Sequence, residues 1–445
     1  MSGKLNFVLT FIYMAILTGI IAGQYVESLF VLYSICVIVA LVSAFLLYGS
    51  IKKLPFSNYF LIASFIMIMT IPLVGPKESA SLENRELAPY PEFRVSNVWK
   101  FLKEYKKYYE DRFAYRSRMM EVVARFKMQV LSISPIPDRV EVGEDNWLFS
   151  SGDYYIELIS KPFPENELKL IETNLEIITS WLAQKNIRFY FLCAPVKSRI
   201  YPDKMPPALR RLNEFSRLDQ VYTYLKNNKN INVIDVRHEL IEGRKIRETY
   251  LQTDTHWNEY GAFLAYKKVM ETMQKDIPGL ALHDLNAYHI DTSIYDAGDL
   301  LQVMGVKHAF PYTYYKMTLK SGLEAVPVDS THVGEFAPQT SIRACPGSPN
   351  KRRIYVNRDS MTEYLKIFIS TSFEYTCYYW KPQLNVTLAL QEKPEIILHE
   401  MQEIFISHTL KLPAEIKADT AFINANFPDY DVIEKSVDLS KTILF

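Results

Sequence analysis

The chain has 445 residues, and its 50 Lys and Arg side chains balance 50 Asp and Glu side chains, so its formal net charge is zero. Binding to nucleic acid relies on an excess of positive charge that neutralises phosphates, so this balance argues against a nucleic-acid partner. The four cysteines are widely spaced and form no CxxC pair, which argues against a disulfide framework or a zinc knuckle.

The N-terminal part, residues 1–76, contains three long apolar runs at about 5–23, 29–48 and 57–74. Each run is close to the roughly 20 residues that an α-helix needs to cross the hydrocarbon layer of a membrane. A cleaved signal peptide would have one short apolar stretch, whereas three successive runs are typical of a retained helical bundle. We therefore predict an N-terminal three-helix transmembrane segment.

The charges around these runs predict the orientation of the chain. Lys4 precedes the first run, and Lys52 and Lys53 lie between the second and the third. Because cytoplasmic loops are enriched in Lys and Arg, we expect the N-terminus inside, and three crossings then place the rest outside. The predicted location is the cytoplasmic (inner) membrane, as a multi-pass protein with its large domain in the periplasm or outside the cell.

Residues 77–140 have the pattern of a helical stalk. Trp99, Leu102, Tyr105 and Tyr109 recur at steps of three or four residues among charged side chains, which is typical of an amphipathic helix. We expect this stalk to connect the membrane segment to the large domain.

The rest of the chain alternates between helical and strand patterns in two blocks, about 165–275 and 350–425. The predicted helices are 165–184, 214–227, 258–273, 361–370 and 401–410, and the predicted strands are 187–194, 231–236, 354–357, 375–380 and 394–399. This alternation is typical of a parallel sheet with helices packed on it. We predict an α/β domain over residues 141–425, with an irregular insertion at about 300–350 and a C-terminal tail at 426–445.

Two short stretches contain candidate catalytic groups. Asp254 and His256 come just before a predicted helix, and Ser360 lies between a predicted strand and a predicted helix. A serine hydroxyl needs a neighbouring base, and an imidazole needs an acceptor that fixes its tautomer. Side chains two residues apart on an extended segment project to the same side, so Asp254 can orient His256. A strand-to-helix corner exposes the hydroxyl beside helix N–H groups that can stabilise an oxyanion.

Less specific interpretations of the same residues stay open. An Asp-Thr-His run is often only a capped loop, and an Asp-Ser after a strand is often only a helix cap. Asp254 and His256 are also residue types that bind metals, but the sequence contains no HExxH motif, and we predict no metal and no cofactor. Both stretches lie immediately before the N-terminus of a predicted helix, and this shared position favours the catalytic interpretation.

Seven stretches between about residues 80 and 410 form an ordered set. They are residues 83–85, 111–116, 143–149, 193–202, 254–262, 298–301 and 359–360. In sequence and order this set resembles the alginate O-acetyltransferase-related, SGNH-hydrolase-like proteins, which include those called DHHW proteins. The resemblance implies an SGNH-like α/β fold with helices on both faces of the sheet.

In that family, the Asp and His of an Asp-x-His motif and a later Ser form a catalytic triad. The resemblance therefore assigns these roles to Asp254, His256 and Ser360. Family members add acetyl groups to extracytoplasmic polysaccharide, often receiving them from a membrane-bound O-acyltransferase. The implied function is a membrane-anchored O-acetyltransferase of a cell-envelope or exported polysaccharide, with an acyl-serine intermediate, a polysaccharide acceptor and a membrane-bound O-acyltransferase as donor partner.

Three further residues are predicted to bind substrate. Lys197 and Tyr201 follow the predicted strand 187–194 within one of the family-like stretches, and Trp257 follows His256. A proline-shaped surface loop is the alternative for Lys197 and Tyr201. Two other functions also stay open for the whole chain: a carbohydrate acetylesterase that uses water in place of the sugar hydroxyl, and a non-catalytic polysaccharide-binding or assembly subunit.

Overall fold

The computed structural model describes residues 86–153, 161–209, 216–306, 310–328, 336 and 338–442. The three predicted membrane spans lie outside these residues. Among the helices that are described, none has both the length and the apolar character needed to cross a membrane. The chain divides into two compact units, one formed by Met1–Leu131 with Gln302–Val306 and the other by Ser132–Leu301 with Lys307–Phe445.

The described part of the first unit contains two helices, α4 (Val98–Arg112) and α5 (Arg116–Leu131), preceded by a short 3-10 turn, η1 (Val95–Asn97). Asn97 caps α4, because its side chain accepts a hydrogen bond from the Lys100 N–H. Both helices agree with the helical pattern predicted for the stalk.

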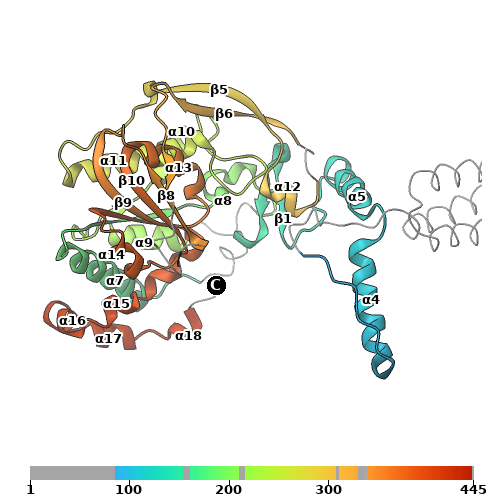
Figure 1. The fold of residues 1–445 in the computed structure, drawn as a ribbon, viewed down its shortest axis with the longest axis horizontal. Helices are drawn as coiled ribbons and strands as arrows, with labels where there is room; N and C mark the ends of the chain where they lie inside the picture. Colours follow the sequence, from blue (N-terminus) through green and yellow to red (C-terminus); the bar gives the residue numbers. More distant parts are fainter. Residues whose placement is uncertain are drawn as a thin grey trace, which may run out of the picture. The chain divides into compact units, whose positions relative to one another are not determined.

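The second unit is built on a seven-stranded sheet in the order β4-β3-β11-β9-β10-β8-β7, of which β9, β10 and β8 are labelled in Figure 1. The strands are β3 (Arg188–Ala194), β4 (Val233–Ile234), β7 (Val326–Val328), β8 (Thr340–Ala344), β9 (Asn350–Arg358), β10 (Phe373–Trp380) and β11 (Ile396–Gln402). From β4 to β10 all neighbours are parallel, as predicted, whereas β8 pairs antiparallel with both β10 and β7.

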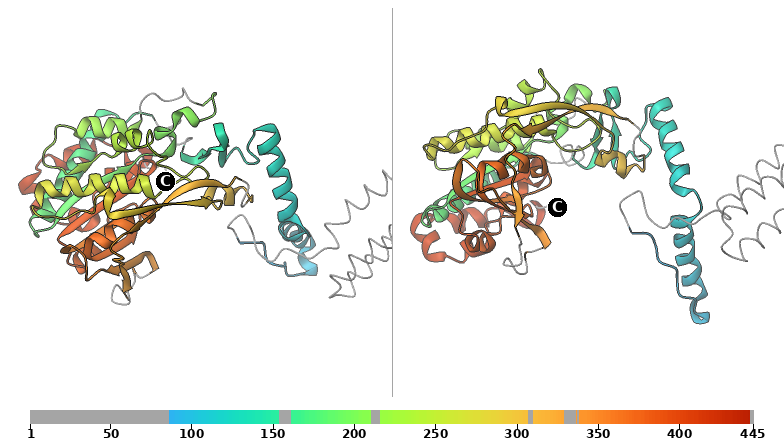
Figure 2. Two further views of the ribbon diagram at one scale, coloured as in Figure 1. Left: turned by 90° about the horizontal axis from the view of Figure 1, so that it is seen from above. Right: turned by 45° about the horizontal axis from the view of Figure 1, so that its top comes forward.

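Two smaller antiparallel pairs accompany this sheet. They are β1 (Val140–Val142) with β2 (Leu148–Ser150), and β5 (Tyr288–Tyr295) with β6 (Tyr312–Leu319). Both views in Figure 2 show the long β5–β6 hairpin, drawn in yellow, running beside the sheet rather than within it.

Helices cover both faces of the sheet. On β3, Tyr190 and Leu192 pack in one core with residues of α11 (Glu259–Asp276) and α13 (Thr362–Ser372), whereas Phe189 and Phe191 pack in a second core with residues of α7 (Glu165–Ala183) and α9 (Arg217–Leu225). This division follows from the strand geometry, because successive side chains point to opposite faces. The prediction of helices on both faces of an α/β sheet is therefore confirmed.

Four of the predicted helices, 165–184, 214–227, 258–273 and 361–370, correspond to α7, α9, α11 and α13, and the other helices after residue 131 have no predicted counterpart. The helices described there are α7 (Glu165–Ala183), α8 (Lys197–Ile200), α9 (Arg217–Leu225), α10 (Arg237–Gly243), α11 (Glu259–Asp276), α12 (Asp299–Val303), α13 (Thr362–Ser372), α14 (Val386–Gln391), α15 (Ala414–Lys417), α16 (Thr420–Asn426), α17 (Tyr430–Lys435) and α18 (Leu439–Thr442). Where a helix was expected from residue 401, β11 instead continues to Gln402 and a 3-10 helix, η6 (Glu403–Leu410), follows.

Two segments differ from the expected domain limits. The interval 300–350, expected to be irregular, contains β6, β7 and β8, and the last two extend the sheet at its edge. Pro327 lies in β7, the edge strand, where the missing N–H is tolerated. The expected tail contains α17, and Tyr430 of this helix is buried in the core that includes residues of α7. Residues 426–442 therefore belong to the packed domain.

Candidate functional site

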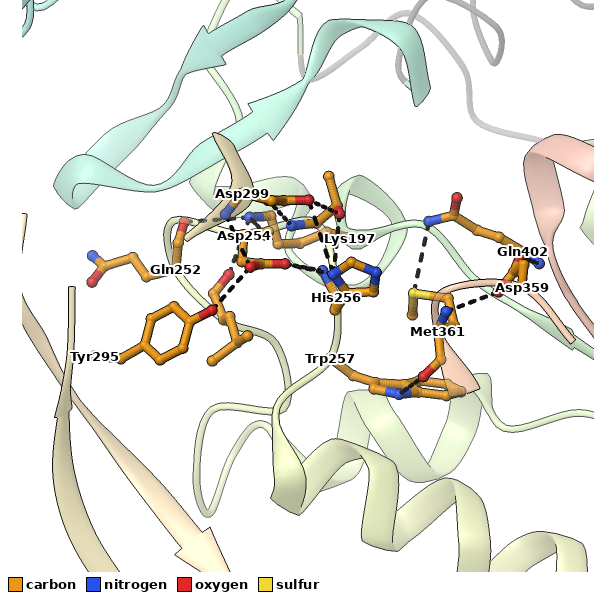
Figure 3. Close-up of polar contacts among 12 residues, drawn as sticks. Lys197, Gln252, Asp254, His256, Trp257, Tyr295, Asp299, Asp359, Met361 and Gln402 are labelled. Atoms are coloured by element: carbon orange, nitrogen blue, oxygen red, sulfur yellow. Dashed lines mark hydrogen bonds and ion pairs between the residues drawn. The ribbon is translucent and has the colours of Figure 1, made fainter. Parts of the chain in front are cut away.

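Asp254 and His256 lie in the loop before α11 and are bonded to each other. The Asp254 Oδ1 atom lies 2.6 Å from His256 Nδ1 and also accepts the backbone N–H of His256 at 3.1 Å (Figure 3). With the ring proton on Nδ1, the Nε2 atom of the neutral imidazole is left as the base. The loop ends two residues after His256, where the Asn258 side chain caps α11 by accepting the Gly261 N–H at 2.9 Å.

The second carboxylate oxygen of Asp254 is also held. Its Oδ2 atom accepts the Tyr295 hydroxyl and the Asp299 backbone N–H, each at 3.0 Å. Burial by itself raises the pKa of Asp254, but the hydrogen bond and charge of His256 outweigh it and hold this pKa well below its usual range. Asp254 is therefore an ionised, immobilised acceptor for the imidazole.

The pKa of His256 is set by opposing effects. Burial lowers it, but the hydrogen bond and charge of Asp254, with the charges of Asp299 and Asp359, raise it above its ordinary value of 6.5. The side chain is 17% exposed, and its buried Nε2 atom has no hydrogen-bond partner among the described residues. A buried ring nitrogen without a partner suits a group that accepts a proton from a bound hydroxyl.

A hydrogen bond joins the two predicted catalytic stretches. The Trp257 Nε1 atom donates to the Met361 carbonyl at 2.8 Å, so the residue after His256 holds the residue after Ser360. In Figure 3 the second imidazole nitrogen lies on the side that faces Asp359 and Met361. Ser360 is half-buried, and its hydroxyl is not bonded to His256 Nε2. The hydrogen bond from Trp257 to Met361 joins the two stretches, and direct proton transfer between Ser360 and His256 stays a prediction.

The corner that carries Ser360 is tied down by Asp359. Its Oδ1 atom accepts the Met361 N–H at 2.8 Å, and its Oδ2 atom accepts the Gln402 N–H at 2.6 Å. We expected the backbone N–H groups at this helix start to be free to stabilise an oxyanion. The Met361 N–H is instead already bonded to Asp359. The Gln402 side-chain amide lies nearby, with Nε2 3.9 Å from the Met361 sulfur, which is a weak acceptor.

Glu400 supports the same corner from β11. Its Oε2 atom accepts the Thr362 hydroxyl at 2.6 Å and the Asp359 N–H at 3.3 Å. Burial, followed by the charge of Asp359, raises the pKa of Glu400 well above its ordinary value. A neutral Glu400 lets two carboxyl groups share this buried position without the repulsion of two full charges.

Lys197 fixes the loop that carries Asp254. Its buried ammonium donates to the carbonyls of Leu251 at 3.1 Å, Gln252 at 3.3 Å and Asp254 at 2.6 Å. Burial lowers the pKa of Lys197 to about 8, against the opposing charges of Asp299, Asp254 and Asp153. These contacts give Lys197 a positioning role, and its predicted contact with substrate is not tested by them.

Tyr201 and Trp257 are buried as well. The Tyr201 ring stacks on Trp147 with centroids 4.2 Å apart, and its hydroxyl accepts the Thr249 N–H at 2.7 Å. The Trp257 indole is fully buried. Both rings pack the segment that carries the Asp254–His256 pair, and their predicted contact with substrate stays a prediction.

Asp299 was assigned no role from the sequence. Its side chain accepts the Thr255 N–H at 2.9 Å and the Thr255 hydroxyl at 2.6 Å, and its own N–H binds Asp254. The preceding Gly298 allows this approach, because a Cβ atom there would overlap the Thr253 carbonyl. The one feature of the sequence that could have indicated a role for Asp299 is its position in 298–301, one of the stretches that resemble the family.

Asp254, His256 and Asp299 also place ligand-type atoms within 4.8 Å of one another, as a metal site would. However, His256 Nδ1 and Asp254 Oδ1 already bond each other at 2.6 Å, and the Lys197 ammonium lies 2.6 Å from the Asp254 carbonyl. A bound cation would have to break the hydrogen bond between His256 and Asp254. It would also be repelled by the positive charge of the Lys197 ammonium. The arrangement therefore suits proton transfer better than metal binding.

Comparison with known proteins agrees with the predicted resemblance. Residues 140–333 match the family model described as "SGNH hydrolase-like domain, acetyltransferase AlgX". This range includes Asp254, His256 and Asp299, and Ser360 lies beyond it. The resemblance to an SGNH-like α/β domain is therefore confirmed, and the family description agrees with the predicted class of enzyme.

The chain is also similar to the "Probable alginate O-acetylase AlgJ" of Azotobacter vinelandii, with 24% identity over 141 residues, which is 30% of this chain. The match spans about a third (34%) of that curated relative. Among solved structures, Bacillus cereus PatB1 has a TM-score of 0.46 and 15% identity, covering 62% of this chain and 99% of that one. A DHHW family protein from Eubacterium siraeum has a TM-score of 0.42 and 14% identity, covering 63% and 94%.

Proposed function

We propose that the chain is an O-acetyltransferase that acts on a cell-envelope or exported polysaccharide. The observation that carries this proposal is the hydrogen bond between Asp254 and His256 Nδ1, which leaves His256 Nε2 without a partner among the described residues. The match of residues 140–333 to an acetyltransferase family and the name of the AlgJ relative support acetyl as the transferred group. A polysaccharide hydroxyl is the acceptor in this proposal.

The proposed reaction has two steps that use the same base. In the first step the Ser360 Oγ atom forms a bond to the acetyl carbon, His256 Nε2 takes the serine proton, and the donor's C–O bond breaks. His256 then returns the proton to the leaving alcohol. In the second step a sugar hydroxyl attacks the acetyl-serine ester, gives its proton to Nε2, and Ser360 recovers a proton as its ester bond breaks.

The proposed location decides the donor. We place the large domain outside the cytoplasmic membrane, anchored as a multi-pass protein by the apolar runs within residues 1–76. No pool of acyl-CoA reaches that side, so the acetyl group arrives as an ester or from a membrane-bound O-acyltransferase partner. A donor delivered at the membrane fits a domain that stays tethered there.

Gln402 is the oxyanion donor in this mechanism. Its backbone N–H is bonded to Asp359, next to Ser360, and its side-chain N–H is directed at a sulfur that binds it only weakly. A negatively charged oxygen on the reacting acetyl carbon would be a much stronger acceptor. We expect Gln402→Ala to lower kcat by about 10²- to 10³-fold.

The Gln402 prediction is measured as the kcat for an activated acetyl ester, compared with Gln274→Ala as the matched control. Gln274 lies on α11 and donates to the Leu280 carbonyl, so the control removes one glutamine amide outside the site. If kcat of Gln402→Ala matches that of the control, Gln402 is not the donor.

The function is tested by following both products of one reaction. The purified full-length chain in detergent is incubated with an activated acetyl ester and envelope polysaccharide, and acetylated glycan and free acetate are measured. We expect acetylated glycan. Free acetate alone would instead support the acetylesterase, which uses the same triad with water. Neither product, in protein that remains folded, would support the non-catalytic subunit.

A further inference from the structure

Helix α5 carries an exposed apolar face. Five of its exposed apolar side chains lie along one side of the helix, and we name this set the α5 stripe. The α5 stripe consists of Met119, Val122, Val123, Phe126 and Val130. Val122, Phe126 and Val130 are 62%, 55% and 64% exposed, which is unusual for large apolar residues at regular helical spacing.

The stripe is not the buried face of α5. The buried residues of α5 are Ala124 and Met128. At 3.6 residues per turn, these two lie on the opposite side of the helix from Met119 and Phe126. α5 is therefore apolar on two faces, and one of them faces outward.

Basic side chains border the stripe on both sides. By the same helical geometry, Arg116 and Lys127 lie along one margin and Arg118 and Arg125 along the other. Glu121 is the one acidic residue of the helix, and it pairs with Arg125 at 2.8 Å. An apolar face between two basic margins is the composition of helices that lie in the boundary of an anionic lipid layer.

The position of α5 in the chain indicates the same partner. The last predicted apolar run ends at about residue 74, and α4 begins at Val98, so α4 and α5 are the first α-helices of the described part after the predicted membrane segment. We propose that the α5 stripe binds the headgroup boundary of an anionic lipid bilayer. This inference rests on the membrane anchoring in the proposed function and adds a second membrane contact to it.

The inference is tested with nitroxide labels on the full-length chain in nanodiscs of phosphatidylcholine and phosphatidylglycerol. The three cysteines of the described part are buried, so labels can be directed to Cys36 or to introduced cysteines. Labels are placed at Val122→Cys and at Phe126→Cys in a Cys36→Ala background. Ile246→Cys is the matched control, because Ile246 is an apolar side chain that is 75% exposed in the second unit.

We expect the labels at 122 and 126 to collide with oxygen more than with a water-soluble nickel chelate, and the label at 246 to show the reverse. Water-like accessibility at 122 and 126 would overturn the inference. Dipolar broadening between labels of two chains would also overturn it, because a second copy would then cover the stripe. A label on native Cys36 separates the proposed membrane anchoring from the proposed α5 contact. If the label at Cys36 lies in lipid while the labels at 122 and 126 lie in water, the anchoring is supported and only the α5 contact is refuted.

Discussion

Replacing Ser360 with alanine is expected to abolish turnover of an activated acetyl ester, with a loss of about 10⁴-fold or more. In the proposed mechanism the Ser360 hydroxyl forms the covalent acetyl intermediate, so removing this oxygen removes the intermediate. The same variant should lose labelling by a serine-directed fluorophosphonate. Both quantities are measured on the full-length chain in detergent, as steady-state kcat/KM and as labelled protein after a fixed exposure.

The control for this experiment is Ser341→Ala. Ser341 lies on β8, and its buried hydroxyl has no hydrogen-bond partner among the described residues, so its loss should disturb little. We expect Ser341→Ala to retain turnover and labelling. Undiminished acetyl transfer by folded Ser360→Ala would refute the acyl-serine mechanism, and it would leave the assembly-subunit function or a different nucleophile.

Asp254→Asn is expected to produce the second largest effect, a fall in kcat/KM on the order of 10⁴-fold. An asparagine amide can donate to His256 Nδ1, which favours the tautomer with its proton on Nε2. That tautomer cannot take the proton of Ser360. The substitution also removes the charge that stabilises the imidazolium formed during the reaction.

The pH dependence gives this prediction a second readout. His256 must be neutral to accept a proton, and its pKa lies above the ordinary 6.5 chiefly because Asp254 outweighs the effect of burial. In the wild-type chain, kcat/KM should therefore fall as the pH drops through a midpoint above 6.5. In Asp254→Asn the burial effect dominates, so we expect the midpoint of the residual activity to move to lower pH.

A matched control for the lost carboxylate is Asp419→Asn. Asp419 accepts a hydrogen bond from Trp181 and caps α16, outside the candidate site. Its replacement should leave both kcat/KM and the pH midpoint in place. If Asp254→Asn keeps the wild-type midpoint, the raised pKa of His256 has another origin, and Asp254 is not the group that orients the base.

Local features of this chain could be predicted from sequence because they depend on near neighbours. The helix 165–184 and the strand 187–194 correspond to α7 and β3, since periodicity of apolar residues reports which side of an element is buried. The Asp254–His256 bond joins residues two apart, so their spacing alone indicated it. The cap at Asn258 is local for the same reason.

The structure alone decided the contacts that join distant parts of the chain. Asp299 reaches Asp254 across 45 positions, Lys197 reaches it across 57, and Gln402 reaches Asp359 across 43. The contact of Gln402 with Asp359 depends on β11 and β9 being neighbours in the sheet, and β8 and β7 joined its edge although no pattern predicted it. The sequence by itself therefore determined local elements such as α7 and β3 and the pairing of Asp254 with His256. Tertiary structure determined what surrounds that pair, because burial and hydrogen bonding between distant segments exist only once the sheet has formed.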